Sequence, residues 1–373
     1  MNAPEPMPAT PLRNPTRSTV RSAEVVIRCA DVSEALDFYH ERLGFLVDAI
    51  FPADSPTTVV LRGYGLRLRL DPDGPGPARL RLICDDPSDI SDDHLLVAPD
   101  GTVVELVDAN PPLVVPDVTQ SFVLQRAADE DSWGVGRAGM RYRDLIPNRQ
   151  GGRFIASHIQ IPDAGPVPDY VHFHKVRFQM IYCYRGWVRL VYEDQGEPFI
   201  MRAGDCVLQP PEIRHRVLEA SAGLEVIEIG CPALHETYAD PSMPLPNAHV
   251  NPDRDFGGQR YTFHCSQGAA WTSDRNGFDR RRFGLREATG GVGEASVLRL
   301  SGSTGISVPA TKEAHDGEFY FAFVLEGSPT LERGEEDAFA MERGDCVVIP
   351  AGEPFAFVAS SAGVEILEVA LPG

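Results

Sequence analysis

The sequence has few of the features that mark membrane proteins or nucleic-acid-binding proteins. No apolar run approaches the roughly 18 residues needed to cross a bilayer, and the first twenty residues have no apolar signal core. Lys and Arg number 34 against 54 Asp and Glu, so the net charge of −20 repels phosphate backbones and anionic lipids. We therefore expect a cytoplasmic protein that binds neither nucleic acid nor membranes.

Paired cysteines and long helical periods are also scarce. The seven cysteines form no Cys-x-x-Cys pair, and an odd number of scattered cysteines indicates neither a disulfide framework nor a thiolate zinc site. The 34 glycines and 32 prolines favour short strands and turns over long helices. A chain of 373 residues with this composition predicts a mainly β protein of two or three domains.

The N-terminal third has a pattern of its own. Residues 1–20 contain five prolines and little apolar content, so we expect a disordered leader. Residues 21–110 predict a small α+β module with a helix over 32–45. Its strands are expected at AEVVIRC, VVLRGYG, LRLRL, ARLRLIC and TVVELVD. A proline-rich linker is expected at 111–121.

The rest of the chain contains an internal repeat with an offset of about 140 residues. Each copy has short alternating runs bounded by Gly and Pro, which predicts two jelly-roll barrels over 122–240 and 241–373. Three pairs of segments recur: RAGDCVLQPPEIRHRV as RGDCVVIPAGEPFAFV, SAGLEVIEIGCP as SAGVEILEVALP and, more loosely, WGVGRAGMRYR as WTSDRNGFDRRR.

The first copy contains a group of candidate metal ligands. His172 and His174 lie two apart on a predicted strand, so both imidazoles face the same side of the sheet. Gln179 lies five residues after His174, Gly186 seven residues after Gln179, and the segment GDCVLQPPEIRH ends at His215. The alternative is that these histidines are ordinary strand and core residues.

This spacing resembles the two motifs of the cupin superfamily: His-x-His, an acid and a glycine, followed by a second motif that ends in His. The resemblance covers about residues 122–372 and implies a bicupin. It also implies one divalent metal bound by His172, His174, Gln179 and His215. Gln179 stands where the family usually has Glu, so the donor set has no negative charge. Fe(II) is the favoured metal, with Ni, Mn, Cu or Zn as alternatives.

The second copy has lost most of these ligands. Glu313 and His315 align with the His pair, Tyr320 aligns with Gln179, and Phe355 aligns with His215. Because only one imidazole is left, we expect no metal in this barrel and a role in structure or dimer packing. Alternatively, Glu313, His315 and Tyr320 line a small-molecule pocket.

Strand periodicity suggests further pocket residues in the first copy. His158 and Gln160 share one strand face; if that face looks into the barrel, His158 is a candidate general acid or base. A solvent-facing edge is the alternative. Ile181 and Cys183 share the parity of Gln179 and are candidate pocket residues, which puts Tyr182 and Tyr184 outside the barrel.

Residues 20–110 resemble the glyoxalase, or vicinal-oxygen-chelate, family, whose modules have a βαβββ order. AEVVIRCADVSEALDFYHERLGF is similar to its opening strand and helix, and APDGTVVELVD to its closing strand. The resemblance implies Glu24 and Glu105 as metal-ligand positions. The second half-unit is shortened, so a structural or dimerisation role is expected.

Three functions remain open from the sequence. The first is a metal-dependent enzyme that acts on a small, oxygen-rich substrate. Within this class a non-haem dioxygenase is favoured, because the resemblance to bicupins implies ring- or C–C-cleaving dioxygenases. The second is a redox-neutral isomerase, cyclase or lyase, which the uncharged Gln179 favours. The third is a non-catalytic small-molecule-binding protein. A homodimer is expected in each case.

Overall fold

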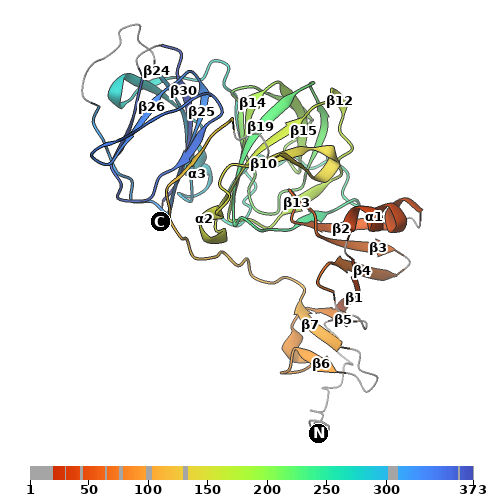
Figure 1. Ribbon diagram of the computed structural model, residues 1–373. Coiled ribbons are helices and arrows are strands. Elements are labelled where there is room, and N and C mark those ends of the chain that lie inside the picture. Colours follow the sequence, from red (N-terminus) through yellow and green to blue (C-terminus); the bar gives the residue numbers. More distant parts are fainter. Residues whose placement is uncertain are drawn as a thin grey trace, which may run out of the picture. The chain divides into compact units, whose positions relative to one another are not determined.

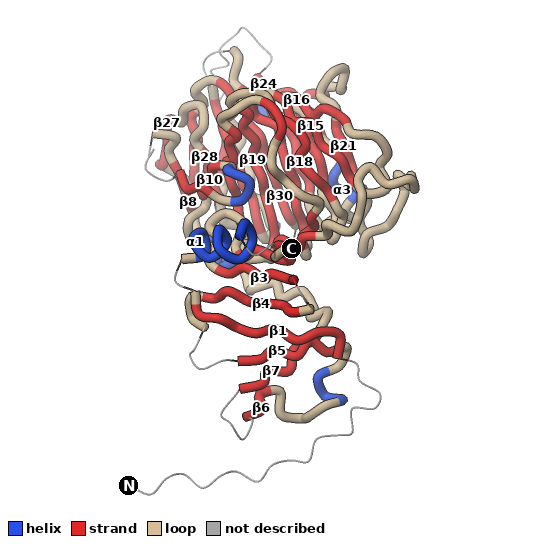
Figure 2. Tube along the Cα trace, turned by 90° about the vertical axis from the view of Figure 1, so that its right-hand side faces the viewer, coloured by secondary structure: helices blue, strands red, loops and turns tan. Residues whose placement is uncertain are grey.

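The computed structural model divides the chain into two compact units, and strands dominate both (Figure 2). One unit is Met1–Pro52 with Pro56–Leu113, and the other is Ala53–Ser55 with Val114–Gly373. The structure describes residues 20–29, 31–42, 45–63, 65–74, 79–97, 103–128, 133–300, 310–359 and 362–372. The leader expected at 1–20 lies outside the described residues, apart from Val20. No helix in the described ranges has the length and apolar character needed to cross a membrane.

The first unit contains one mixed sheet in the order β2-β3-β4-β1-β5-β7-β6. Its strands are β1 (Val20–Arg28), β2 (Leu46–Phe51), β3 (Thr58–Gly63), β4 (Leu66–Asp71), β5 (Arg79–Cys84), β6 (Leu95–Val97) and β7 (Val103–Asp108). The alternation in β4 buries Leu68 and Leu70 while its arginines stay partly exposed. Five of these strands match the sequence prediction, whereas β2 and β6 were not predicted.

The helix expected over 32–45 is shorter in the structure. Helix α1 (Val32–Leu36) begins where the Asp31 carboxylate accepts a hydrogen bond from the Ser33 amide at 2.9 Å. A wider helical turn, Asp37–Arg42, continues it. Predicted positions 43 and 44 lie outside the described residues, and Phe45, the last predicted position, is not helical.

The first barrel is built from two sheets (Figure 1, yellow to green). One sheet has the order β16-β15-β18-β13-β20, with β12 beside β18, and the other has the order β21-β17-β14-β19-β11-β10-β9. The strands of the first sheet are β12 (Gly165–Pro166), β13 (His172–His174), β15 (Trp187–Tyr192), β16 (Phe199–Arg202), β18 (His215–Ala220) and β20 (Thr237–Ala239). Those of the second are β9 (Trp133–Val135), β10 (Arg141–Asp144), β11 (Ile155–Ile161), β14 (Phe178–Arg185), β17 (Cys206–Leu208), β19 (Leu224–Cys231) and β21 (Thr262–His264).

The second barrel also has two sheets (Figure 1, blue). Their orders are β22-β23-β24-β30-β25-β28-β8 and β27-β26-β29. The strands are β8 (Val123–Gln125), β22 (Thr272–Ser273), β23 (Phe278–Arg282), β24 (Glu294–Leu300), β25 (Phe319–Glu326), β26 (Thr330–Arg333), β27 (Asp337–Ala340), β28 (Cys346–Val348), β29 (Phe355–Val358) and β30 (Glu365–Leu371). Two single-turn helices, α2 (Arg149–Gly152) and α3 (Leu285–Ala288), lie between the strands of this unit.

The two barrels exchange edge strands, which changes the predicted domain boundaries. Strand β8, expected to open the first barrel, pairs with β28 of the second. Strand β21, expected in the second barrel, pairs with β17 of the first. A division at residue 240 therefore does not separate the two sets of sheets, because β8 covers the β28 edge and β21 covers the β17 edge of the other copy.

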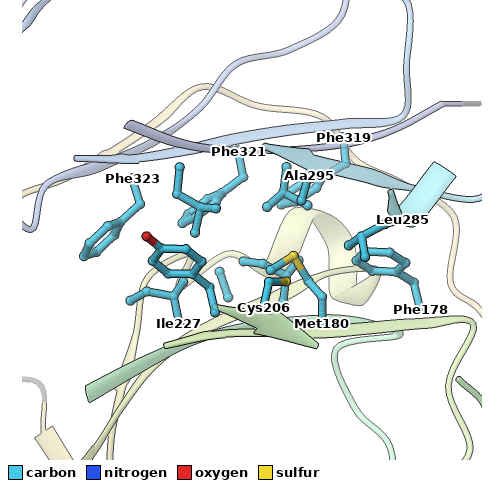
Figure 3. Close-up of a cluster of buried hydrophobic side chains, with 14 of the residues drawn as sticks. Phe178, Met180, Cys206, Ile227, Leu285, Ala295, Phe319, Phe321 and Phe323 are labelled. Carbon is cyan, nitrogen blue, oxygen red and sulfur yellow. The ribbon is translucent and has the colours of Figure 1, made fainter. Parts of the chain in front are cut away.

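An apolar interface joins the barrels (Figure 3). One face of β14 contributes Phe178 and Met180, and the facing strand β25 contributes Phe319, Phe321 and Phe323, all in one buried cluster. The cluster also contains Tyr182 and Tyr184, which lie outside the first barrel as their parity predicts. The outer faces of these strands are apolar because each barrel packs on the other.

Candidate functional site

Three histidines meet inside the first barrel. Strand β13 supplies His172 and His174, and the neighbouring strand β18 supplies His215, which stands directly opposite His172 in the register. Their side chains are buried, and the ring centroids of His172 and His215 lie 4.2 Å apart. One nitrogen from each ring lies within 4.8 Å of the others. This arrangement is typical of a metal site with imidazole ligands.

The hydrogen bonds of the three rings fix which nitrogen is available. The Nδ1 atoms of His172, His215 and His174 lie 2.7, 3.0 and 3.4 Å from the backbone carbonyls of Tyr170, Ile213 and Glu236 respectively. A carbonyl can only accept, so each Nδ1 has the proton and each Nε2 is left as an acceptor; that of His172 lies 3.1 Å from a guanidinium nitrogen of Arg137.

The three imidazoles are also uncharged at neutral pH. Burial is the largest cause that lowers the pKa of all three, and the pKa of His215 falls to about 4. Neutral imidazoles with unprotonated Nε2 atoms fit a divalent metal ion.

Gln179 has a carboxylate partner that the sequence reasoning missed. Its amide Nε2 donates to Oε1 of Glu228 on strand β19 at 2.5 Å. The amide nitrogen is thus engaged, and the carbonyl oxygen is the atom that could coordinate a metal. Burial raises the pKa of Glu228. The signal was present in the repeat, since Glu228 and Glu368 are acidic residues at equivalent positions of two mainly apolar last strands.

Arg137 is a second functional candidate that the sequence reasoning missed. Its Nη2 lies 3.1 Å from Nε2 of His172, and its guanidinium forms an ion pair with Asp169, whose side chain is fully buried. Burial alone would lower the pKa of Arg137, but the charge and hydrogen bond of Asp169, together with Tyr142 and Tyr170, outweigh burial and raise the pKa. The Nε atom of Arg137 has no hydrogen-bond partner. A permanent cation with a spare donor therefore lies beside the histidines.

His158 lies elsewhere, which corrects its predicted place beside the metal. Its Nε2 is 2.8 Å from a Glu225 carboxylate oxygen, and its ring packs against Trp133, Tyr184 and Phe323. The adjacent residue of β11, Ile159, packs in the barrel interior, so period two turns His158 outward to the other barrel. Gln160 shares this outer face and accepts a 3.4 Å hydrogen bond from Arg141.

Ile181 and Cys183 pack in the apolar interior of the first barrel. Burial raises the pKa of the Cys183 thiol to about 12, so the thiol stays protonated. Both side chains contribute an apolar wall and no reactive group.

In the second barrel, the aligned residues make contacts of a different kind. Glu313 forms an ion pair with Arg275. His315 Nε2 lies 2.7 Å from the carbonyl of Ile349, so this nitrogen has the proton and cannot coordinate a metal. The Tyr320 hydroxyl donates to Glu368. Among the described residues, no second group of three ligand-type side chains converges as the three histidines do.

In the first unit, the two weaker candidates bind arginine instead of standing free for a metal. Glu24 is buried and lies 3.3 Å from both Arg67 and Arg81. Arg81 also lies 3.2 Å from Glu105 and so bridges the two carboxylates. Their charges are compensated by guanidinium groups, which argues against the metal-ligand roles implied by the resemblance.

Comparison with known proteins identifies a cupin domain in part of the chain. Residues 305–370 match the family model of the cupin domain. The match falls on the second copy, although the motif resemblance is stronger in the first. No curated protein matches the sequence.

Solved structures of similar shape have low sequence identity. The protein Ylba from E. coli is 12% identical, with a TM-score of 0.48 over 69% of this chain and 93% of that chain. An oxalate decarboxylase from Lactobacillus farciminis is 14% identical, with a TM-score of 0.46 over 70% and 87%. A salicylate 1,2-dioxygenase from Pseudoaminobacter salicylatoxidans is 16% identical, with a TM-score of 0.48 over 69% and 82%. Because these scores lie below 0.5, the likenesses do not indicate a shared activity.

Proposed function

We propose that the first barrel is the metal centre of an enzyme that acts on a small, anionic, oxygen-rich substrate as a non-haem dioxygenase. The observation that supports this most is the set of three neutral histidines with engaged Nδ1 atoms. His172, His174 and His215 would hold the metal, with the Gln179 carbonyl as a fourth donor. A bound divalent ion, Fe(II) in this proposal, would polarise adjacent substrate oxygens and supply redox chemistry.

The protein's own residues would select and orient the substrate. Arg137 offers a fixed positive charge and an unpartnered Nε donor beside His172, which suits a carboxylate or enolate oxygen. Asp169 holds the guanidinium in place, because one of its oxygens pairs with Arg137 while the other accepts from the Val217 amide at 2.9 Å. Ile181 and Cys183 belong to the apolar interior of the same barrel, which would help to exclude water from it.

A redox-neutral isomerase, cyclase or lyase is the second candidate, and Gln179 favours it. A donor set of three imidazoles and an amide has no negative charge to support an oxidised metal. Oxygen uptake separates the two candidates, and turnover of any kind separates both from a non-catalytic binding protein.

The test begins with elemental analysis of protein purified without added metal. Near-stoichiometric iron, with oxygen consumption on a panel of diketones, catechols and hydroxy acids, is the expected result. His172→Ala and His215→Ala should each lose most of the metal, whereas the exposed His249→Ala should keep it as the matched control. Unchanged metal content in both site variants would overturn the assignment.

The role of Arg137 predicts a separation between binding and metal content. Arg137→Lys keeps the charge but loses the planar fork of donors. We expect unchanged metal content and a rise in KM of about tenfold or more for an anionic substrate, which corresponds to roughly 1.4 kcal/mol. An unchanged KM would exclude Arg137 from substrate binding.

The homodimer, the cytoplasmic location and the vicinal-oxygen-chelate character of residues 21–110 belong to the same proposal. Light scattering on the full chain tests the dimer, and cell fractionation tests the location. A structural or dimerisation role for residues 21–110 is supported by the arginine partners of Glu24 and Glu105.

A further inference from the structure

The second barrel contains a cavity at the place equivalent to the three-histidine cluster. The cavity has a volume of 620 Å³ and is lined in part by Glu313, His315, Tyr320 and Phe355. Glu313 and Phe355 bridge their strands as His172 and His215 do in the first barrel. A cavity of this size suits a small organic molecule.

Two polar groups of the first barrel recur around this cavity. Arg275 corresponds to Arg137 in the loosely repeated segment. Each arginine is followed by a residue with a positive φ, 55° at Ala138 and 53° at Asn276. The same turn thus places an arginine at each site. Glu368 corresponds to Glu228 in the repeat. Glu228 accepts a hydrogen bond from Gln179, and Glu368 accepts one from Tyr320, which aligns with Gln179. The second barrel has therefore lost its metal ligands but kept the polar groups around them.

One substitution changes the charge that a ligand would meet. In the first barrel, Arg137 faces the neutral His172 and keeps an unpartnered Nε. In the second, Glu313 stands in place of His172 and forms an ion pair with Arg275. Both arginines thus have a carboxylate partner, Asp169 for Arg137 and Glu313 for Arg275, but Arg137 keeps a buried Nε without a partner and faces a neutral ring, whereas Arg275 faces a carboxylate.

Other charged side chains that line the cavity also form ion pairs. Arg280 pairs with both Asp274 and Glu368, and it donates to the Ser296 hydroxyl at 2.6 Å. Four arginines and five acidic residues line the cavity as a whole. An anion bound at Arg275 or Arg280, or a cation bound at Glu313 or Glu368, would compete with one of these pairs and leave a partner uncompensated. A hydroxyl group can donate to a carboxylate and accept from a guanidinium without breaking either.

An aromatic wall completes the cavity. Tyr320 lies between His315 and Phe355, with ring centroids 5.4 and 4.8 Å away. The Nδ1 of His315 is a buried acceptor without a partner. Flat apolar rings beside paired polar groups suit a molecule with a carbon face and several hydroxyls.

We propose that the second barrel is a metal-independent binding site for a neutral small molecule with several hydroxyl groups. This site is distinct from the metal centre of the proposed function and does not depend on it.

The test uses saturation-transfer NMR and calorimetry on the full chain, with D-glucose, D-xylose and myo-inositol as neutral probes and succinate as the anionic probe. We expect at least one neutral probe to bind the wild type. The same probe should bind the metal-free His172→Ala variant with the same affinity. Ala314→Trp, an exposed substitution at the lining, should weaken that binding tenfold or more. Ala338→Trp, exposed on β27 away from the lining, is the control and should bind normally. Absence of binding by all three neutral probes, or equal binding by Ala314→Trp, would overturn the proposal.

A second variant tests the charge argument itself. Glu313→Gln removes the partner of Arg275 at an exposed position, so it should not disturb the core. Succinate should bind this variant at least tenfold more tightly than it binds the wild-type second barrel, measured in the His172→Ala background to exclude the first barrel. No gain in succinate affinity would show that Glu313 does not set the charge preference. Neither binding experiment depends on metal or turnover in the first barrel. The proposed enzyme function and the proposed second binding site can therefore be overturned independently of each other.

Discussion

At the scale of single residues, the role of each histidine depends on which ring nitrogen the surrounding structure engages. In the first barrel, backbone carbonyls engage Nδ1 and leave Nε2 unprotonated, as a metal ligand must be. In His315, a carbonyl engages Nε2 instead, so the ring stays in the sequence repeat but cannot act as the same ligand. His158 pairs with a carboxylate at the barrel interface. Spacing in the sequence cannot show these differences, because they depend on the positions of backbone carbonyls.

The first residue-scale prediction concerns His158 and pH. Burial lowers its pKa below 6.5 in the folded protein. As the pH falls below 6.5, the unfolded chain therefore takes up a proton that the folded protein resists, and stability is lost. The pKa of Glu225 is also lowered, despite its burial, by the hydrogen bond from His158. The stability that the Glu225 carboxylate contributes is fully present above pH 4.5 and is lost as the pH falls further.

His158→Gln should therefore lose less stability than the wild type on acidification from about pH 7 to pH 5. Thermal melting at several pH values measures this, and the remaining histidines cancel because both proteins contain them. Parallel curves for the two proteins would contradict the prediction.

At the scale of elements, the sequence predicts which side chains share a strand face, but not which strand or barrel that face packs against. The parity of β14 correctly put Tyr182 and Tyr184 outside the first barrel, because a strand alternates its faces whatever covers them. Whether an outward face meets water or another barrel depends on tertiary packing, so the interface role of His158 was not predictable. The exchange of β8 and β21 was missed for the same reason, since both are three-residue strands that depend on a partner edge.

The interface between the barrels gives the element-scale prediction. Leu325 is 3% exposed and belongs to the buried cluster shared by the two barrels, whereas Leu234 is 50% exposed. Leu325→Ala should lower the free energy of unfolding by about 2–5 kcal/mol, because the truncation leaves a cavity. Leu234→Ala makes the same chemical change at the surface and should cost less than about 0.5 kcal/mol. Urea denaturation measures both, and equal losses would show that the interface is not a stabilising contact.

At the scale of the whole molecule, two copies of one fold have kept different parts of one polar site. The first barrel has the three histidines and an arginine with a spare donor, whereas the second has a cavity and an arginine paired with Glu313. The internal repeat and the histidine spacing predicted the two β-rich copies and the loss of ligands in the second. Glu228 and Arg137 escaped prediction because an isolated acid or arginine in a strand or turn resembles any surface charge. Only the fold shows that they point to the histidines or to Gln179.

The last prediction tests how far the metal acts on the whole molecule. A ligand that binds only the folded state stabilises it by about 2.7 kcal/mol when its concentration is 100 times the Kd. For a unit of this size, that corresponds to a rise in Tm of roughly 5–10 °C. Removal of metal with a chelator should therefore lower the Tm of the wild type by this amount, and added metal should restore it.

His172→Ala and His215→Ala should melt at the same temperature with and without metal, since the ligand set is incomplete. The exposed His249→Ala should respond to metal like the wild type. If the site variants keep the metal-dependent shift, the stabilising ion is bound outside the first barrel. Because Glu24, Glu105, Glu313 and Glu368, the other candidate carboxylates, pair with arginines or with Tyr320, we expect the shift to depend on the three histidines.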